Sequence, residues 1–168
     1  MKTPFISLAA LGLFVLGCSE PTATSPVASF ANAGNGVVHR VSAGGHDLDI
    51  AGNTDANFSL VAIEYGDGSA SGEWTDQFGQ QDGGFHAAIN CLSVVGNQAW
   101  VSGVITSGGV PGVDFTGLPV ITRVADVGTS ASDAPDLISF SFIGVPVPCT
   151  AQPDLPLLPM TDGQVTVN

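Results

Sequence analysis

The chain has 168 residues, 44% of them hydrophobic, which suits about one domain on the usual range of roughly 100–200 residues. Only three residues are basic against 15 acidic ones, and the formal net charge is −12. This balance excludes nucleic acid as a partner, because phosphate binding needs several Lys or Arg side chains on one face. The hydrophobic content excludes a chain that is disordered throughout.

Residues 1–17 have the organisation of an export signal. The apolar run 5–16 would make a helix of about 18 Å, too short to cross a hydrocarbon core of about 30 Å. At Gly17-Cys18 the segment resembles the lipobox of bacterial lipoproteins. That resemblance implies cleavage after Gly17 and a lipid such as palmitate on Cys18. The alternative, an ordinary secretory signal cut after Ala33, places the cut far beyond the apolar run.

Residues 18–35 are predicted to be the lipidated Cys18 followed by a tether. They are rich in Ser, Thr, Ala and Pro and have no periodicity. If the envelope has two membranes, Ser19 after the Cys resembles the signal for sorting to the outer membrane. We therefore expect the protein to be attached to a membrane of the cell envelope through its lipid.

A single β domain is expected over residues 36–168. Short alternating runs are separated there by Gly, Asn and Asp turns, which is typical of all-β domains. Most connections are short, so strands that follow one another are expected to pair. The predicted strands are 36–43, 46–51, 57–65, 70–78, 84–95, 98–106, 118–127, 136–143 and 164–167.

Eight or nine strands in this order predict an antiparallel meander, folded as a small up-and-down barrel. A two-sheet β-sandwich is the alternative. Prolines recur in residues 146–159, and because proline cannot donate to a ladder, this segment is expected to form an irregular strap. Alternation also predicts that Cys91 faces the core together with Phe85, Ala87 and Ile89.

Two cysteines remain once Cys18 is assigned to the lipid. In an exported protein, two remaining cysteines predict a disulfide, here between Cys91 and Cys149. This bond would connect the strap covalently to the sheet. A catalytic or metal-binding thiol would need other signals, and no C-x-x-C spacing is present.

The sequence contains no recognisable catalytic constellation. A G-x-S-x-G elbow, a P-loop and a dinucleotide-binding glycine motif are all missing from it. Glu64 and Glu73 flank one predicted hairpin, where exposed turn acids are the simpler interpretation. We predict no catalytic residue and no cofactor.

Acidic and histidine residues give no metal motif either. His46, Asp47 and Asp49 are the densest set, but they lack zinc spacing, and alternation in a strand sends them to both faces. The runs 52–57 and 66–69 look superficially like calcium loops without completing the motif. We predict no metal ligand.

Aromatic side chains are the most suggestive remaining feature. Tyr65, Trp74, Phe85 and Trp100 fall on consecutive predicted strands. Such a set can line a barrel interior that holds a small apolar ligand. The alternative is ordinary core packing.

Several motifs together resemble a group of exported bacterial β domains. They are N-F-S-L-x-A at 57–62, D-G-S-x-S-G-E-W at 67–74, C-L-S-V-V-G-N-x-A-W-V-S-G at 91–103, D-x-G at 126–128 and P-D at 135–136. The resemblance covers about residues 40–149 and implies export and one compact β domain. It implies no activity, and the Asn and Arg residues common in the first of these strands are missing here.

The function expected from the sequence is that of a lipid-anchored envelope protein that is not an enzyme. Its β domain would bind an envelope protein partner or a small ligand. Two alternatives stay open at this point: a barrel enzyme of isomerase or cyclase type acting on an apolar substrate, and a calcium-dependent surface adhesion module.

Overall fold

The computed structural model describes residues 36–49, 53–79, 83–128 and 133–168. The predicted signal peptide (1–17), Cys18 and the tether (18–35) lie outside these residues. Within the described ranges, no helix is long and apolar enough to cross a membrane.

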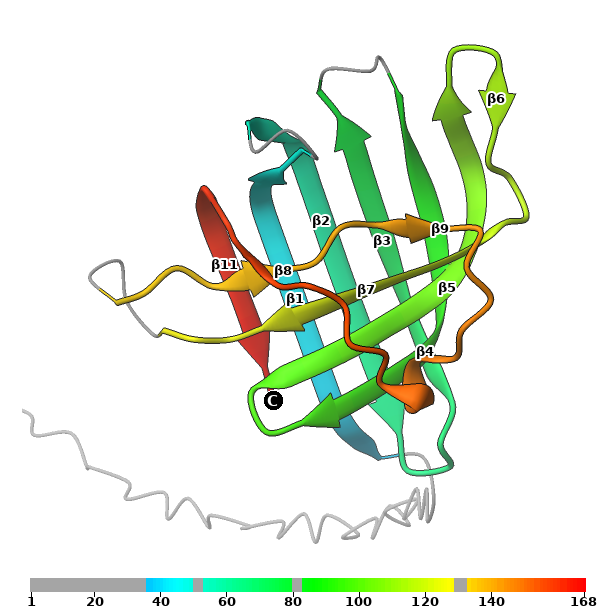
Figure 1. The fold of residues 1–168 in the computed structure, drawn as a ribbon. Coiled ribbons are helices and arrows are strands. Elements are labelled where there is room, and N and C mark those ends of the chain that lie inside the picture. Colours follow the sequence, from blue (N-terminus) through cyan, green and yellow to red (C-terminus); the bar gives the residue numbers. More distant parts are fainter. Residues whose placement is uncertain (1–35, 50–52, 80–82, 129–132) are drawn as a thin grey trace, which may run out of the picture. The chain divides into compact units, whose positions relative to one another are not determined.

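The described chain is an all-β antiparallel meander whose sheet of nine successive strands is curled into a half-barrel (Figure 1). The predicted fold class is confirmed. The order in the sheet is β10-β8-β7-β5-β4-β3-β2-β1-β11, with β6 paired to β5 and β9 to β7. The elements are β1 (Val37–Leu48), β2 (Thr54–Tyr65), β3 (Ala70–Phe78), β4 (Gly83–Val95), β5 (Gln98–Val110), β6 (Val113–Asp114), β7 (Pro119–Ala125), β8 (Leu137–Ile138), β9 (Phe142–Ile143), the short 3-10 helix η1 (Cys149–Ala151), β10 (Leu158–Pro159) and β11 (Asp162–Val167).

The two ends of the sheet, β10 and β11, are not joined by strand pairing. The backbone N–H groups of Val165 and Val167 in β11 donate instead to carboxylates, Asp136 Oδ2 at 2.6 Å and Asp126 Oδ2 at 3.2 Å. These carboxylates accept the hydrogen bonds that carbonyl groups of a further strand would accept, so the edge of β11 is capped. The sheet therefore stays a half-barrel, whereas the sequence favoured a closed barrel.

The first predicted pair of strands is one continuous strand, β1. Gly44-Gly45 was expected to end a strand at this point, but β1 passes through both residues and pairs with β2 and β11. Gly45 has a φ of 147°, and a Cβ atom there would lie 2.3 Å from the carbonyl oxygen of Asp162. Its missing side chain thus allows the close approach of β11 rather than a turn.

A β-bulge in β4 reverses the direction of Cys91. Ile89 pairs with Gly103 and Cys91 pairs with Ser102, so Asn90 is an extra residue on β4. Leu92 then joins the core, and Cys91 turns to the opposite face. The prediction that Cys91 shares the core phase of Ile89 is wrong, because alternation holds only as long as the ladder is regular.

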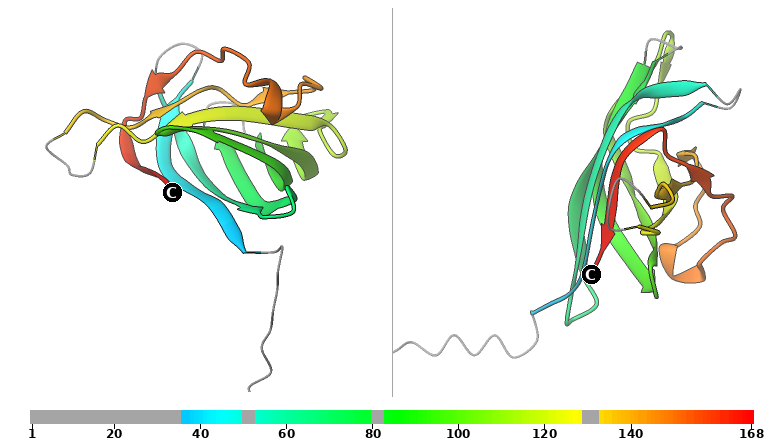
Figure 2. Two further views of the ribbon diagram at one scale, coloured as in Figure 1. Left: turned by 90° about the horizontal axis from the view of Figure 1, so that it is seen from below. Right: turned by 90° about the vertical axis from the view of Figure 1, so that its left-hand side faces the viewer.

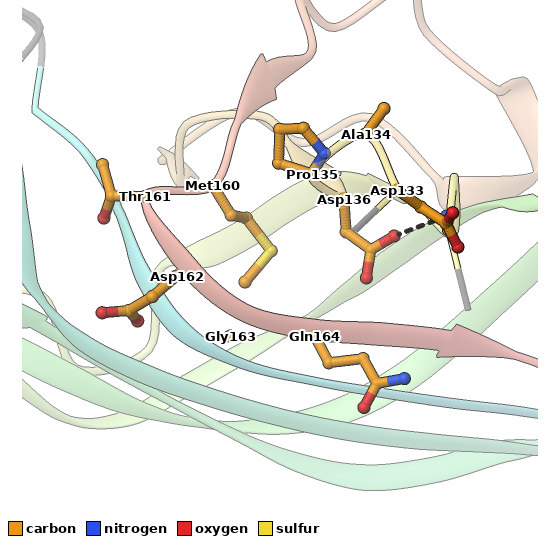
Figure 3. Close-up of a pocket in the computed structure, with 10 residues that line it drawn as sticks. Asp133, Ala134, Pro135, Asp136, Met160, Thr161, Asp162, Gly163 and Gln164 are labelled. Carbon is orange, nitrogen blue, oxygen red and sulfur yellow. Dashed lines mark hydrogen bonds between the residues drawn. The ribbon is translucent and has the colours of Figure 1, made fainter. Parts of the chain in front are cut away.

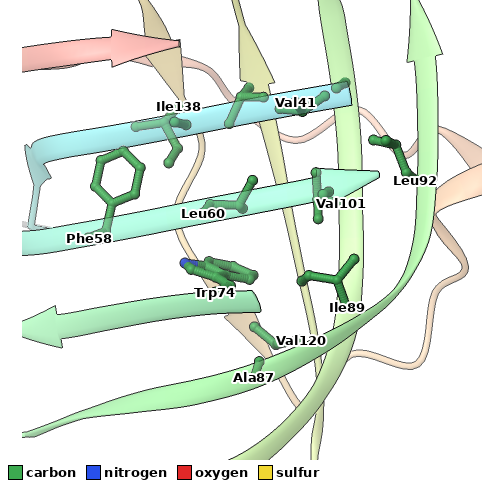
Figure 4. Packing of buried hydrophobic residues seen from close by; sticks show 14 of the residues in the cluster. Val41, Phe58, Leu60, Trp74, Ala87, Ile89, Leu92, Val101, Val120 and Ile138 are labelled. Atoms are coloured by element: carbon green, nitrogen blue, oxygen red, sulfur yellow. The ribbon is translucent and has the colours of Figure 1, made fainter. Parts of the chain in front are cut away.

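The core lies on the concave side of the half-barrel (Figure 4). Side chains from the long strands β1–β5 meet those from β7, β8 and the segment before β11. Trp74 and Leu60 are among the largest fully buried side chains. The members of the cluster are Val41, Ala43, Phe58, Leu60, Ala62, Trp74, Phe85, Ala87, Ile89, Leu92, Ala99, Val101, Ile105, Val120, Val124, Ile138, Met160 and Val165.

The Pro-rich strap (146–159) lies against the other face of β5 and β7, and Figure 2 shows it on the side of the molecule away from β1–β3. Trp100 Nε1 donates to the carbonyl oxygen of Pro153 at 2.8 Å. Arg123 Nη1 donates to Leu155 O and to Asp154 Oδ1, both at 3.0 Å, and its guanidinium group lies 5.0 Å from the centre of the Trp100 ring. Backbone carbonyls of the strap, which strand pairing would otherwise satisfy, are therefore bound by side chains of the sheet.

Candidate functional site

Trp74 and Phe85, two of the four predicted ligand-lining residues, pack against each other inside the core. Their ring centres are 5.0 Å apart with the planes at 77°. Phe78 and Phe115 continue this row of rings, at 6.0 Å and 6.4 Å, toward half-buried positions. Trp74 Nε1 is buried and has no hydrogen-bond partner among the described residues. Both predicted residues thus serve core packing, the alternative named for them.

The other two predicted residues, Tyr65 and Trp100, lie elsewhere. Trp100 is on the face of β5 that the strap covers, since its neighbours Ala99 and Val101 belong to the core. Tyr65 is half-buried at the end of β2, where its hydroxyl lies 3.1 Å from Ser71 Oγ. The four aromatic residues therefore do not surround one space.

His46, the histidine of the densest predicted polar set, pairs with Asp162 of β11. Its Nδ1 lies 2.7 Å from Asp162 Oδ1, which also accepts the backbone N–H of His46. The side-chain hydrogen bond from His46 holds the pKa of Asp162 below its ordinary value of 3.8. A lowered pKa means that ionised Asp162 stabilises the fold above that value, and this contribution is lost as the pH falls through the lowered pKa.

The remaining acids of the predicted motifs serve local structure. Asp49 accepts the backbone N–H of Asn53 at 2.8 Å, and Asp67 accepts both the N–H and the hydroxyl of Ser69. The bond from Asp67 to the N–H two residues on is typical of an Asx turn, and the bond from Asp49 spans four residues of the connection between β1 and β2. Across the described parts of the chain, no group of three or more His, Cys, Asp or Glu side chains could hold a metal ion. The run 52–57 lies partly outside those parts.

Glu64 and Glu73 do not form a carboxylate pair. Glu64 pairs with Ala70, in phase with buried Leu60 and Ala62, and Glu73 pairs with Val61, in the opposite phase. The two side chains therefore project from opposite faces of the sheet. Because the sheet lies between them, the two carboxyl groups cannot flank one substrate, as the paired carboxylates of acid–base catalysis do.

A cavity of about 620 Å³ lies at the seam between the two ends of the sheet (Figure 3). One wall is the segment 133–136 before β8, together with Gly128, and the other is the segment 160–164, which leads into β11. Carboxylates of Asp133, Asp136 and Asp162 line it, with the Met160 side chain in the middle. We call this space the seam cavity.

Asp136 holds the seam cavity in shape. It is 8% exposed, and its carboxylate accepts three backbone N–H groups: Val127 at 2.8 Å, Gly128 at 3.3 Å and Val165 at 2.6 Å. Its own carbonyl oxygen accepts the N–H of Met160 at 2.9 Å. One residue thus fixes both walls of the cavity relative to each other.

Sequence reasoning missed this site. Its walls come from segments about 30 residues apart that meet only when the sheet curls, and no local pattern reports such a contact. The one signal was indirect: Asp126 and Pro135-Asp136 belong to the motifs of the resemblance. In the structure, the carboxylates of Asp126 and Asp136 accept hydrogen bonds from backbone N–H groups of β11 and so cap its edge.

Comparison of the chain with protein-family models, with curated proteins and with solved structures gave no match.

Proposed function

We propose that this protein is a lipoprotein of the cell envelope whose half-barrel binds a small ligand without catalysis. The observation that carries the proposal is the seam cavity of about 620 Å³. Its volume falls within the range of about 300–1,000 Å³ usual for small-molecule sites. Carboxylates and the thioether of Met160 in its lining give it both polar and apolar contact surface.

The ligand is placed at the seam rather than among the aromatic residues of the core. Trp74 is 1% exposed and Phe85 is 2% exposed, and both are in contact with other members of the core cluster. A ligand at their position would have to displace packed side chains, which costs several kcal/mol on the scale of about 3–5 kcal/mol for deleting a buried aromatic residue. The seam cavity needs no such displacement.

The location in the envelope is supported by the N-terminal segment and by the disulfide. Cys91 and Cys149 are bonded with their Cα atoms 5.9 Å apart, and disulfides persist in oxidising compartments outside the cytoplasm. The charge of −12 would repel an anionic membrane, so attachment would depend on the acyl chains of Cys18. The resemblance to exported bacterial β domains supports the same location.

A co-purifying ligand is the first expected result. Native mass spectrometry of the full chain, extracted from its own membranes in mild detergent, should show a non-covalent adduct that denaturation removes. The variant Ala134→Trp, which adds a large side chain at an exposed position of the cavity lining, should carry less of it. A chain that carries no adduct, or an adduct unaffected by this variant, would contradict ligand binding at the seam.

Membrane attachment is expected to depend on Cys18. Cys18→Ala should move the protein from the membrane fraction to the soluble fraction and remove the mass of the acyl chains, because no other residue would carry the lipid. Cys149→Ala is the matched control, since it also removes one cysteine but should leave fractionation unchanged. Cys18→Ala protein that stays in the membrane fraction would contradict lipid anchoring.

A further inference from the structure

We propose that the half-barrel rests on the lipid surface of the membrane with the end from which β1 starts. The inference rests on the proposed attachment through Cys18, and it adds which face of the domain the membrane contacts. Three observations carry it: where exposed apolar side chains gather, where the chain from Cys18 enters the domain, and how charge is distributed between the two ends of the strands.

Exposed valines gather at this end of the half-barrel. Eight large hydrophobic side chains are exposed among the described residues, and four of them belong here. They are Val37, Val38, Val95 and Val127, with exposed fractions from 43% to 60%. We call these four side chains the anchor-side rim. Exposed apolar groups that collect on one surface are typical of contacts with a membrane or with another protein.

Hydrogen bonds connect the strand ends that carry the anchor-side rim. The N–H of Arg40 in β1 donates to the carbonyl oxygen of Asn168, the residue after β11, at 2.9 Å. The N–H of Asp126, next to Val127, donates to the carbonyl oxygen of Asn97 at 2.9 Å, in the turn between β4 and β5. The Asp126 carboxylate also caps β11. These ends therefore form one connected edge, and Figure 1 shows the start of β1, the end of β11 and the β4–β5 turn at the lower end of the molecule.

The chain from Cys18 enters the domain at the anchor-side rim. Val37 begins β1, and the predicted tether ends two positions before it, at residue 35. A tether of this length spans at most about 60 Å when fully extended. It therefore confines the domain to the neighbourhood of the lipid surface and gives the rim a high effective concentration there. Valine side chains on strand ends can enter the boundary between headgroups and acyl chains without any change in the fold.

Charge makes the anchor-side rim the less acidic end of the strands. The opposite end carries no Lys or Arg among the described residues. Its acidic residues include Asp49, Asp114 and Asp162. At the rim, exposed Arg40 lies on the same pair of strands as Glu64 and precedes the turn that holds Asp67 only in space, through the pairing of β1 with β2. An anionic membrane therefore repels the opposite end more strongly and favours contact through the rim.

Lipid quenching of an added tryptophan tests the orientation. The full lipidated chain is reconstituted into phosphatidylcholine vesicles in which part of the lipid carries a doxyl quencher on an acyl chain. Val38→Trp places the tryptophan on the rim, and Val113→Trp places it at the opposite end, in β6, where the native side chain is equally exposed at 53%. The added emission of Val38→Trp should shift to the blue and lose intensity with doxyl lipid, because tryptophan at the rim lies in the membrane interface. Val113→Trp should show neither change.

Two further variants show what the contact depends on. Cys18→Ala combined with Val38→Trp should lose the quenching, because a few valines cannot hold an acidic domain on a membrane without acyl chains. Val37→Asp combined with Val38→Trp in the anchored chain should also reduce the quenching, since a carboxylate is costly to place at the lipid boundary. Thermal melts of all variants confirm that each is folded.

The possible outcomes separate this inference from the attachment on which it rests. Equal quenching of both tryptophans, or no quenching of Val38→Trp in a chain that is attached to the vesicles, would overturn the orientation and leave attachment through Cys18 intact. Protection of the rim from hydrogen exchange in native membranes without quenching by lipid would indicate a protein partner and overturn it as well. A chain that does not attach to the vesicles would reject both the attachment and the orientation.

Discussion

Replacing both Cys91 and Cys149 by Ala is expected to lower the free energy of unfolding by about 4 kcal/mol. The disulfide closes a loop with a sequence separation of 58, and the chain-entropy model assigns a loss of this size to the freed unfolded chain. A domain of this length has about 5–15 kcal/mol of stability, so the variant should unfold at a much lower urea concentration. Equilibrium urea unfolding of the full chain measures the difference.

Reductant provides the control for this result. Reduced wild-type protein should unfold at the same urea concentration as the double variant, and reductant should leave the double variant unaffected. The folded strap should persist without the bond, because Trp100 and Arg123 still bind Pro153 and Leu155. A wild-type urea midpoint that does not change on reduction would refute the stabilising role of the disulfide.

Asp136→Ala is expected to lower the free energy of unfolding by about 3–4 kcal/mol. The variant leaves the N–H groups of Val127, Gly128 and Val165 without their acceptor, and an unsatisfied buried donor costs about 1–3 kcal/mol. Val165 is fully buried and lies on the capped edge of β11, so water cannot easily replace the carboxylate there. Urea unfolding again gives the magnitude, and hydrogen exchange should show β11 opening first.

Asp114→Ala is the matched control for Asp136→Ala. Asp114 also accepts a backbone N–H, from Thr116 at 2.8 Å, but it lies at the exposed end of β6, where water can take its place. Its removal should change stability little. If the two variants were equally stable, the carboxylate of Asp136 would not be what holds the end of the sheet.

The two experiments test two different long-range connections. The disulfide ties the strap to β4, and Asp136 ties the segment before β8 to β11. The first could be anticipated because an exported chain with one spare pair of cysteines has a single way to pair them. The second could not, because an aspartate beside a proline in a loop looks like any turn residue until the strand that it caps is in place.

The aromatic residues that were predicted to line a ligand site were likewise predictable only in part. Tyr65, Trp74, Phe85 and Trp100 were selected because they lie on consecutive strands, and this reasoning is correct about the strands. It does not include the direction of each side chain: Trp74 lies on the core face of β3, whereas Trp100 lies on the opposite face of β5 under the strap. Face assignment needs the phase of each strand, and bulges such as the one at Asn90 change that phase.

The sequence by itself determined the all-β class, the order of the long strands and their antiparallel meander, because alternation and tight turns are local properties of the chain. The tertiary structure decided how the sheet ends. Whether a curled sheet closes depends on which groups satisfy the N–H donors of its last strand, and here Asp126 and Asp136 do so in place of a neighbouring strand. The seam cavity exists because these carboxylates hold two sheet ends together without pairing them, which is a contact between distant segments that no local pattern encodes.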